Sequence, residues 1–365
     1  MGSLPGQGRR QLAIIRAMGE IGTDTLDDAL TVFAATAPEY GSLGFANHGP
    51  MACEALAQLG RAEAIPDWVE QYRGRLHEAP PAARALSDEE WPEALGREAT
   101  FPGWLALFER ELADRPAEAV VGEWAPRLVP GTIGAATHGL IRTGHGLRAL
   151  HAADTPPRRL EVANGLAFWA SQYRELPGPP LLIGTEGVAQ ALVDLPYLPE
   201  DAPDEFLISA RVAHVAEISD EFEQAVSSLG PGDDRMQLLD QLAGGGAQGY
   251  LRNADGGGAI GLLHAITSPL ACELLLPWLA AEDRDAALGY VWQAVAALHV
   301  AYDIDRRGPL PAQSTPSLEA LIDRAVASRD EHAIKLTEAA VRSFSRSHDP
   351  TLLWAAADAC ARLAG

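Results

Sequence analysis

The 365-residue sequence predicts an all-α protein. Apolar residues recur at helical spacing along almost the whole chain, and runs that alternate apolar and polar residues are scarce. Apolar residues make up 47% of the sequence, which is enough for a large buried core. These observations favour a multi-helix bundle, and bundles build metal and cofactor sites from side chains that point into their centre. We therefore expect a central cavity for a metal and a substrate.

The expected helices begin at recognisable start signals. Helix 25–35 has Asp27 and Asp28 in its first turn, where negative charge complements the helix dipole. Helices 101–112 and 116–128 have proline early, where its missing N–H would have no helical partner in any case. The other helices rest on amphipathic periodicity, with expected ranges 49–59, 66–76, 136–153, 157–173, 184–195, 204–218, 221–229, 258–279, 284–302, 317–345 and 351–363.

Loops are expected where glycine, proline and polar residues gather, at 78–92, 176–180, 196–203 and 243–258. The last of these is rich in glycine, but no strand precedes it and no Gly-Lys-Ser/Thr follows it. It therefore fits neither a dinucleotide-binding turn nor a P-loop, and we expect a mobile lid or hinge. The chain is expected to form one all-helical domain over residues 1–365, with an alternative division into two helical halves joined near 229–258.

Charge and cysteine content exclude several classes of protein. The net charge of −22 opposes binding to nucleic acids and to anionic membrane surfaces. The three cysteines, Cys53, Cys272 and Cys360, show no Cys-x-x-Cys spacing. A disulfide framework or a thiolate zinc site is therefore not expected, and the cysteines are predicted to be reduced and buried, as in a cytoplasmic protein.

No segment of the sequence has the pattern of a membrane span or a secretory signal. The N-terminal residues lack an apolar core of the signal-peptide type. The longest apolar run, 262–281, is interrupted by His264, Pro269, Glu273 and Pro277. We therefore expect a cytoplasmic protein that does not act at a membrane.

Lys335 is the only lysine in the chain, since the other 27 basic residues are arginines. It follows His332 by three residues, a spacing that places both side chains on one face of a helix. Buried lysine can be neutral and reactive, whereas arginine keeps its charge in proteins. Lys335 is thus a candidate site residue, and a surface lysine kept by chance is the alternative.

Four histidines fall in, or at the start of, predicted apolar helices: His48, His138, His264 and His332. One histidine on an apolar face is usually an ordinary core residue. Four of them, from four separate helices, favour instead a metal site at the centre of a bundle. Several neutral imidazoles suit iron, copper or zinc rather than magnesium or calcium.

His138, Arg142 and His145 are spaced i, i+4 and i+7, which places them on one stripe of a helix. They are expected to face the same cavity, with a polar surface face as the alternative. His299 and Asp303 have the i, i+4 spacing with which a carboxylate can orient an imidazole.

Missing motifs narrow the choice of metal chemistry. The chain has no His-Glu-x-x-His, no Glu-x-x-His and no Gly-x-Ser-x-Gly, so zincin, ferritin-like di-iron and hydrolase-elbow sites are excluded. A site of imidazoles alone lacks an anionic oxygen ligand. Lys335 would supply one if its neutral amine reacted with carbon dioxide to form a carbamate. An unmodified Lys335 that acts as an acid–base or as a simple cation is the competing hypothesis.

Several segments in order along the chain resemble the questin oxidase family. They are Asn-His-Gly-Pro-Met at 47–51, Glu-Ala-Leu at 54–56, the stretch from Trp68 to Tyr72, His-Gly-Leu-Ile-Arg at 138–142, Leu-His-Ala-Ile-Thr at 263–267 and Asp-Glu-His-Ala-Ile-Lys at 330–335. The resemblance implies an all-helical oxygenase of aromatic polyketide metabolism. Such enzymes act on anthraquinone-like substrates, either by Baeyer–Villiger-type insertion of oxygen next to a ring carbonyl or by opening of the quinone ring.

The resemblance also implies a ligand set for non-haem iron, Fe(2+): His48, His138, His264, His332 and a carbamylated Lys335. It leaves open whether His138 or His145 faces the metal. Arg142 is a candidate partner for a developing oxyanion, and His145 a second candidate catalytic residue. NADPH as an external reductant also stays open, because the chain has no nucleotide-binding fingerprint. The expected partners are an aromatic polyketide and O2.

Two other functions compete with the oxygenase. The first is a zinc-type hydrolase or lyase built on the same histidines, which differs because zinc has no redox chemistry. The second is a non-catalytic helical interaction protein whose histidines are core residues. Phe45, Trp68 and Trp292 are candidates for a flat aromatic pocket, with ordinary core packing as the alternative. The sequence predicts neither the oligomeric state nor the exact substrate.

Overall fold

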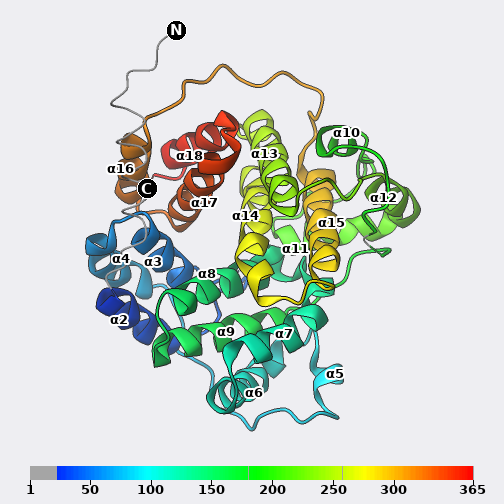
Figure 1. Ribbon diagram of the computed structural model, residues 1–365. Coiled ribbons are helices and arrows are strands. Elements are labelled where there is room, and N and C mark those ends of the chain that lie inside the picture. Colours follow the sequence, from blue (N-terminus) through cyan, green and yellow to red (C-terminus); the bar gives the residue numbers. More distant parts are fainter. Residues whose placement is uncertain (1–22, 180, 257, 365) are drawn as a thin grey trace.

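The structure is a computed structural model that describes residues 23–179, 181–256 and 258–364. It confirms the all-α fold (Figure 1). Within the described residues, the one sheet is a small antiparallel hairpin of β1 (Glu39–Tyr40) and β2 (Phe45–Ala46). The α-helices are α2 (Thr23–Ala34), α3 (Gly49–Gln58), α4 (Ile65–Arg73), α5 (Trp91–Ala94), α6 (Phe101–Asp114), α7 (Ala117–Leu128), α8 (His138–Ala152), α9 (Pro156–Ser171), α10 (Val188–Val193), α11 (Ile208–Ala213), α12 (Ser219–Val226), α13 (Arg235–Asn253), α14 (Ala259–Leu275), α15 (Arg284–Tyr302), α16 (Leu318–Ser328), α17 (Glu331–Ser347) and α18 (Pro350–Arg362).

Short 3-10 helices connect several of these elements. They are η1 (Ala62–Ala64), η2 (Glu98–Thr100), η3 (Val129–Gly131), η4 (Gly134–Thr137), η5 (His214–Ile218) and η6 (Leu276–Trp278). Expected helix 184–195 is confirmed only over α10, with irregular chain on both sides. Expected helix 204–218 starts later than predicted, and it consists of α11 followed directly by the 3-10 helix η5.

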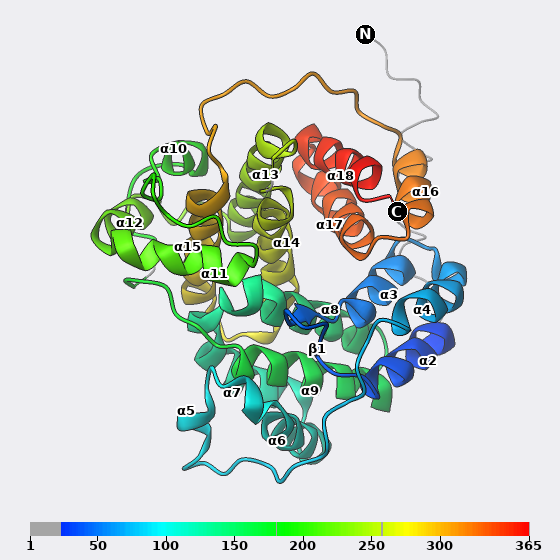
Figure 2. The same ribbon diagram turned by 180° about the vertical axis from the view of Figure 1, so that it is seen from behind.

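Helices α13, α14 and α15 stand side by side, and α8 and α9 lie across one end of this group (Figures 1 and 2). α17 packs against α18, α14 and α3, while α3 also contacts α8. α8 in turn contacts α14. Four helices that are far apart in the sequence, α3, α8, α14 and α17, therefore meet in the middle of the molecule.

The apolar core is divided into three clusters that border this meeting point. The largest lies around α6 to α9 and α15, and the second lies among α13, α14 and α16 to α18. The third packs α2, α3 and α4 against Ala149 of α8 and Ile334 of α17. α14 separates the first two clusters, because Leu263 belongs to one and Ala265 to the other.

The expected loop at 243–258 is wrong over most of its length, because α13 continues to Asn253. Glycine normally weakens a helix by about 1 kcal/mol, but here it allows close packing between helices. A Cβ on Gly246 would lie 2.7 Å from the backbone of Ala265 in α14, and one on Gly249 would lie 2.7 Å from His299 in α15. The segment expected to act as a lid or hinge is thus a core helix.

The expected single helix at 317–345 is in fact two helices, α16 and α17, and this prediction is also wrong. The break is at Arg329, which has a left-handed backbone with φ of 55°. Asp330 then caps α17, because its carboxylate accepts hydrogen bonds from the N–H groups of His332 and Ala333. This cap fixes where α17 begins, and hence where His332 and Lys335 lie.

One segment, Ala259–Trp278, is long and apolar enough to cross a bilayer, but 78% of its apolar window is buried inside the protein. Its apolar surface therefore contributes to the core between the first two clusters. Cys53, Cys272 and Cys360 are free and buried, as expected. The N-terminal residues on which the absence of a signal peptide was argued lie outside the described residues.

Candidate metal centre

His48 directly precedes helix α3, at a turn that is fixed by hydrogen bonds. The Asn47 amide donates to Thr36 Oγ1 and to the Ala37 carbonyl, and its own Oδ1 accepts from the Gly49 N–H. The His48 N–H donates to the Tyr72 hydroxyl of α4 at 2.9 Å. The imidazole therefore enters the centre of the molecule from a well-anchored backbone.

His138 is the first residue of α8 and follows a strained turn. Ala135, Ala136 and Thr137 all have positive φ, from 45° to 70°. Each left-handed residue other than glycine costs about 1–2 kcal/mol, so the surrounding structure must hold this turn in place. The turn aims the Ala135 carbonyl at His138, whose Nδ1 donates a hydrogen bond to it.

The four histidines named from the sequence converge in one cluster, defined here as His48, His138, His264, His332 and Lys335, of which all but His332 are buried. His138 Nε2 lies 2.6 Å from His48 Nε2 and 3.1 Å from His264 Nε2. The ring of His332 lies 4.5 Å from that of His48, centroid to centroid. Lys335 is 2% exposed, and its charge lowers the pKa of three of the imidazoles, so it lies near them.

The hydrogen bonds of His138 and His264 determine which ring nitrogens carry protons. Nδ1 of His138 faces the Ala135 carbonyl, and Nδ1 of His264 faces the Ile260 carbonyl at 2.7 Å. A carbonyl oxygen only accepts, so both Nδ1 atoms carry hydrogen and both Nε2 atoms of the neutral rings hold bare lone pairs. Two such lone pairs 3.1 Å apart repel each other. A cation between them would remove the repulsion.

Burial keeps three of these imidazoles neutral. It is the largest cause that lowers the pKa of His48, His138 and His264, with further lowering by neighbouring imidazoles and Lys335. For His264 the pKa falls to about 3. Burial also lowers the pKa of Lys335 to about 8, although Glu331 and Asp330 oppose it. At neutral pH His48, His138 and His264 thus offer lone pairs rather than protons, whereas Lys335 is mostly protonated.

Glu331 is a member of this neighbourhood that the sequence analysis did not single out. One ligand atom from each of His48, Glu331 and His332 lies within 4.8 Å of the others. Glu331 stands next to His332 in the sequence, but its approach to His48 crosses from α17 to α3. The spacing of residues within one helix cannot predict a contact between two helices that are far apart in the sequence.

Arg142 and His145 do not join the cluster, although they share α8 with His138. Arg142 forms a buried two-point ion pair with Glu161 of α9, with Nε–Oε1 and Nη2–Oε2 distances of 2.7 and 2.9 Å. His145 Nδ1 donates to Glu54 of α3 at 2.6 Å. The three side chains diverge because α8 lies between α9 and α3, and of the two histidines His138 faces the cluster. The catalytic roles of Arg142 and His145 stay predictions.

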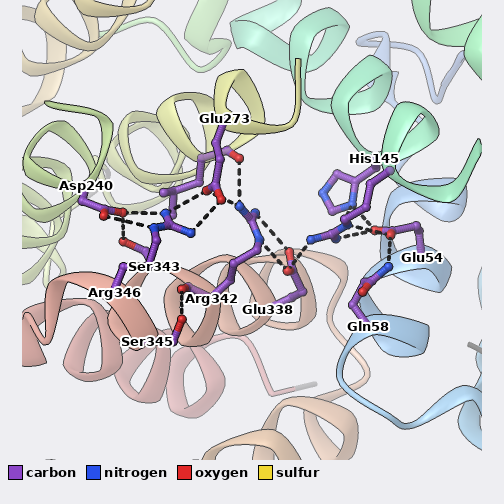
Figure 3. A network of polar contacts seen from close by, with 12 residues as sticks. Glu54, Gln58, His145, Asp240, Glu273, Glu338, Arg342, Ser343, Ser345 and Arg346 are labelled. Atoms are coloured by element: carbon purple, nitrogen blue, oxygen red, sulfur yellow. Dashed lines mark hydrogen bonds and ion pairs between the residues drawn. The ribbon is translucent and has the colours of Figure 1, made fainter. Parts of the chain in front are cut away.

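A chain of ion pairs between buried and partly buried side chains connects the four helices that carry the cluster (Figure 3). Arg148 of α8 bridges Glu54 of α3 and Glu338 of α17. Arg342 of α17 then bridges Glu338 and Glu273 of α14. Burial opposes ionisation of Glu54 and Glu338, but their arginine partners outweigh it and hold both pKa values low. We call the residues Glu54, Arg148, Glu273, Glu338 and Arg342 the ion-pair brace.

Two surface pockets lie away from the cluster. One, of about 800 Å³, is lined by residues that include Asp114, His151 and Arg159. The other, of about 580 Å³, is lined by residues that include His299 and Asp303, whose side chains form the expected pair at 2.9 Å. None of the described lining residues of either pocket belongs to the cluster.

The three aromatic candidates for a substrate pocket lie in different environments. Trp292 is buried and donates to the Val226 carbonyl, and Trp68 stacks on Tyr72. Phe45 is partly exposed and contacts the exposed Phe206. The structure therefore does not gather them around one cavity.

The sequence matches one known protein family. The family model described as questin oxidase-like matches residues 45–245, which is more than half of the chain. The chain belongs to the questin oxidase-like family. None of the curated proteins that were compared matches it. Questin oxidase-like membership implies an oxidase or oxygenase enzyme of the kind found in polyketide and anthraquinone metabolism.

The questin oxidase-like match covers only part of the cluster. His48 and His138 lie inside the matched region, whereas His264, His332 and Lys335 lie beyond its end. The convergence of all five therefore rests on the geometry of the structure and not on the match.

Proposed function

We propose that this chain is a non-haem iron-dependent oxygenase that acts on an aromatic, anthraquinone-like polyketide, and that its cluster holds Fe(2+). The observation that carries the proposal is the facing pair of bare Nε2 lone pairs on His138 and His264, 3.1 Å apart in a buried site. Neutral imidazoles of this kind suit iron, copper or zinc. Iron agrees with membership in an oxidase family, whereas zinc has no redox chemistry.

An iron ion held by these residues would supply electron transfer to molecular oxygen. The residues themselves have three tasks: the backbone carbonyls of Ala135 and Ile260 orient two of the rings, burial keeps the rings neutral, and the same burial limits access of water. A pKa of about 8 leaves part of Lys335 neutral at physiological pH.

The neutral fraction of Lys335 is the form that can become an anionic ligand. Its Nζ lone pair attacks the carbon of carbon dioxide, a C–N bond forms, and an N–H proton leaves to solvent. The product is a carbamate that carries one negative charge. We propose this modification because the imidazoles provide no negative charge of their own to offset that of a metal.

Two reaction outcomes are compatible with the proposed function. In the first, one oxygen atom is inserted next to a ring carbonyl, and the other is reduced to water with two electrons from an external donor such as NADPH. In the second, both oxygen atoms enter the product as the quinone ring opens. Arg142 and His145 are engaged by Glu161 and Glu54, so we propose that they contribute by fixing α8 rather than by contact with substrate.

The test is metal analysis of three proteins purified without added metal: the wild type, Lys335→Arg and a matched control, His299→Gln. His299 is also buried and paired with a carboxylate, but it lies outside the cluster. We expect near-stoichiometric iron in the wild type and the control, and its loss in Lys335→Arg, which places a permanent positive charge beside the imidazoles. A ¹³C-labelled bicarbonate sample should show a carbamate signal only where Lys335 is present.

Other results would change the proposal. Zinc in place of iron, with full activity, would favour the hydrolase or lyase. No metal in any of the proteins, even after anaerobic loading with iron, would mean that the histidines are structural. If iron is present, anthraquinone-like compounds should consume oxygen when they are mixed with the wild-type enzyme.

A further inference from the structure

Glu331 is a buried carboxylate near two cations, Lys335, whose pKa it raises, and Arg75. It is 5% exposed, and Oε1 lies 3.7 Å from the guanidinium of Arg75, a side chain that is 44% exposed. Arg75 also lies over the ring of Tyr72 at 4.7 Å. A half-exposed cation at this distance offsets only part of the cost of burying a carboxylate.

Another group that faces Glu331 is the imidazole of His48. Glu331 Oε1 lies 3.6 Å from His48 Nδ1, and this nitrogen is fully buried without a hydrogen-bond partner. The opposite nitrogen of the same ring, Nε2, lies 2.6 Å from His138 Nε2. The tautomer of His48 therefore decides what this ring presents to His138.

Two tautomers of His48 are conceivable, and Glu331 distinguishes them. With the proton on Nε2, His48 would donate to His138 and would turn a bare Nδ1 lone pair toward the carboxylate, which is repulsive. With the proton on Nδ1, the N–H points toward the carboxylate, which is attractive, and Nε2 is bare. The second form adds a third lone pair to those of His138 and His264.

We infer that Glu331 is a positioning residue of the metal centre, whose negative charge favours the proton of His48 on Nδ1 and so makes His48 Nε2 a ligand. It also supplies a buried negative charge to a cluster of neutral imidazoles. Carboxylates commonly hold metal-bound histidines in this way, and their loss weakens metal binding by roughly 10–100-fold. The inference rests on the proposed metal function. It adds Glu331 to the metal centre, a residue that the sequence motifs did not indicate.

The experiment compares metal binding by the wild type, Glu331→Gln and a matched control, Asp303→Asn. Asp303 is likewise a buried carboxylate that partners a buried histidine, His299, but it lies away from the cluster. Cobalt(II) serves as the probe, its affinity is measured by competition with a chelator, and its visible spectrum reports on the ligand field. ¹⁵N NMR of the zinc-loaded protein reports which nitrogen of His48 carries the proton.

We expect Glu331→Gln to bind cobalt roughly 10–100-fold more weakly, with a changed spectrum and a weakened Nδ1–H signal of His48. Asp303→Asn should keep the affinity and the spectrum of the wild type. Equal affinity and an unchanged His48 signal in Glu331→Gln, while the wild type binds metal, would overturn this inference alone. Absence of metal binding in the wild type would overturn the proposed function as well.

A second variant keeps the inference testable if Glu331→Gln does not fold. Glu331→Asp keeps the negative charge but shortens the side chain by one methylene group. If Glu331→Gln does not fold, Glu331→Asp should still bind cobalt, with an affinity between those expected for Glu331→Gln and the wild type. Wild-type affinity and an unchanged His48 signal in Glu331→Asp would overturn the inference, because the contact at His48 requires the full length of glutamate.

Discussion

Neutral imidazoles that face one another create a pH dependence of stability that is specific to the metal-free protein. The pKa values of His48, His138 and His264 are lowered in the folded chain, chiefly by burial, while in the unfolded chain they lie near 6.5. Above pH 6.5 neither state binds these protons. Below it the unfolded chain binds protons that the folded chain does not, until the folded pKa is reached, about 3 for His264.

We therefore predict that the free energy of unfolding of the metal-free protein falls steadily as the pH is lowered from 6.5 toward 5. Urea unfolding at a series of pH values measures this slope, and His264→Gln should reduce it because one buried imidazole is removed. Identical slopes in the two proteins would show that His264 is not held neutral in the folded state.

Individual residues show how far the sequence could lead to the site. Lys335 and the four histidines were chosen from residue type and helical position, and the structure places them together, while their role as ligands stays a prediction. Glu331 was not singled out because its contact with His48 joins two helices far apart in the chain. The spacing of His138, Arg142 and His145 predicted that all three face one cavity. In the structure they contact different partners, because α8 lies between helices whose positions the sequence did not reveal.

At the scale of the helices, the ion-pair brace connects the four helices that carry the cluster. Arg148 and Arg342 connect Glu54, Glu338 and Glu273, so that α3, α8, α14 and α17 are held by charges in one continuous network. Removal of Arg148 leaves the buried Glu54 without an arginine partner, which is strongly unfavourable, while Glu338 keeps Arg342.

Arg148→Met should therefore destabilise the protein by roughly 3–5 kcal/mol. Its control is Arg362→Met, which removes two more exposed ion pairs, with Asp358 and Asp255, and should change stability by less than about 1 kcal/mol. Denaturant unfolding of both variants gives the comparison. Similar small losses in both would mean that the ion-pair brace adds little to the packing of the four helices.

Glycine in α13 shows why element boundaries were harder to predict than element type. The composition of 244–249 indicates a loop, yet these glycines serve close contacts with other helices that only the folded chain contains. Likewise, the polar residues that follow Ser328 contained the capping signal of Asp330, but the amphipathic pattern continued across it and suggested a single helix.

The two roles of helical glycine can be separated by experiment. Gly246→Ala should destabilise the protein by about 1–3 kcal/mol because its Cβ meets the backbone of Ala265. Gly122→Ala in α7 should instead stabilise it by about 0.5–1 kcal/mol, since the nearest atom to that Cβ lies at 3.5 Å. Thermal or urea unfolding measures both. Stabilisation by Gly246→Ala would show that α13 and α14 are not closely packed.

At the scale of the whole molecule, the cluster lies where the three apolar cores approach one another. α3 and α8 contribute to the core that contains Ile334 of α17, and α14 separates the other two. A metal ion at this point would connect helices from all three cores. The all-α fold was predictable because helical periodicity is a local property, whereas this meeting point depends on contacts between distant segments.

The central claim is that one metal ion binds between the imidazoles of the cluster. Crystals of the iron-loaded protein, with anomalous diffraction recorded above and below the iron absorption edge, test it most directly. We predict one iron peak per chain, about 2 Å from Nε2 of His138 and His264, with Nε2 of His48 also facing it. No peak, or a peak at another pair such as His214 and Glu217, would contradict the account.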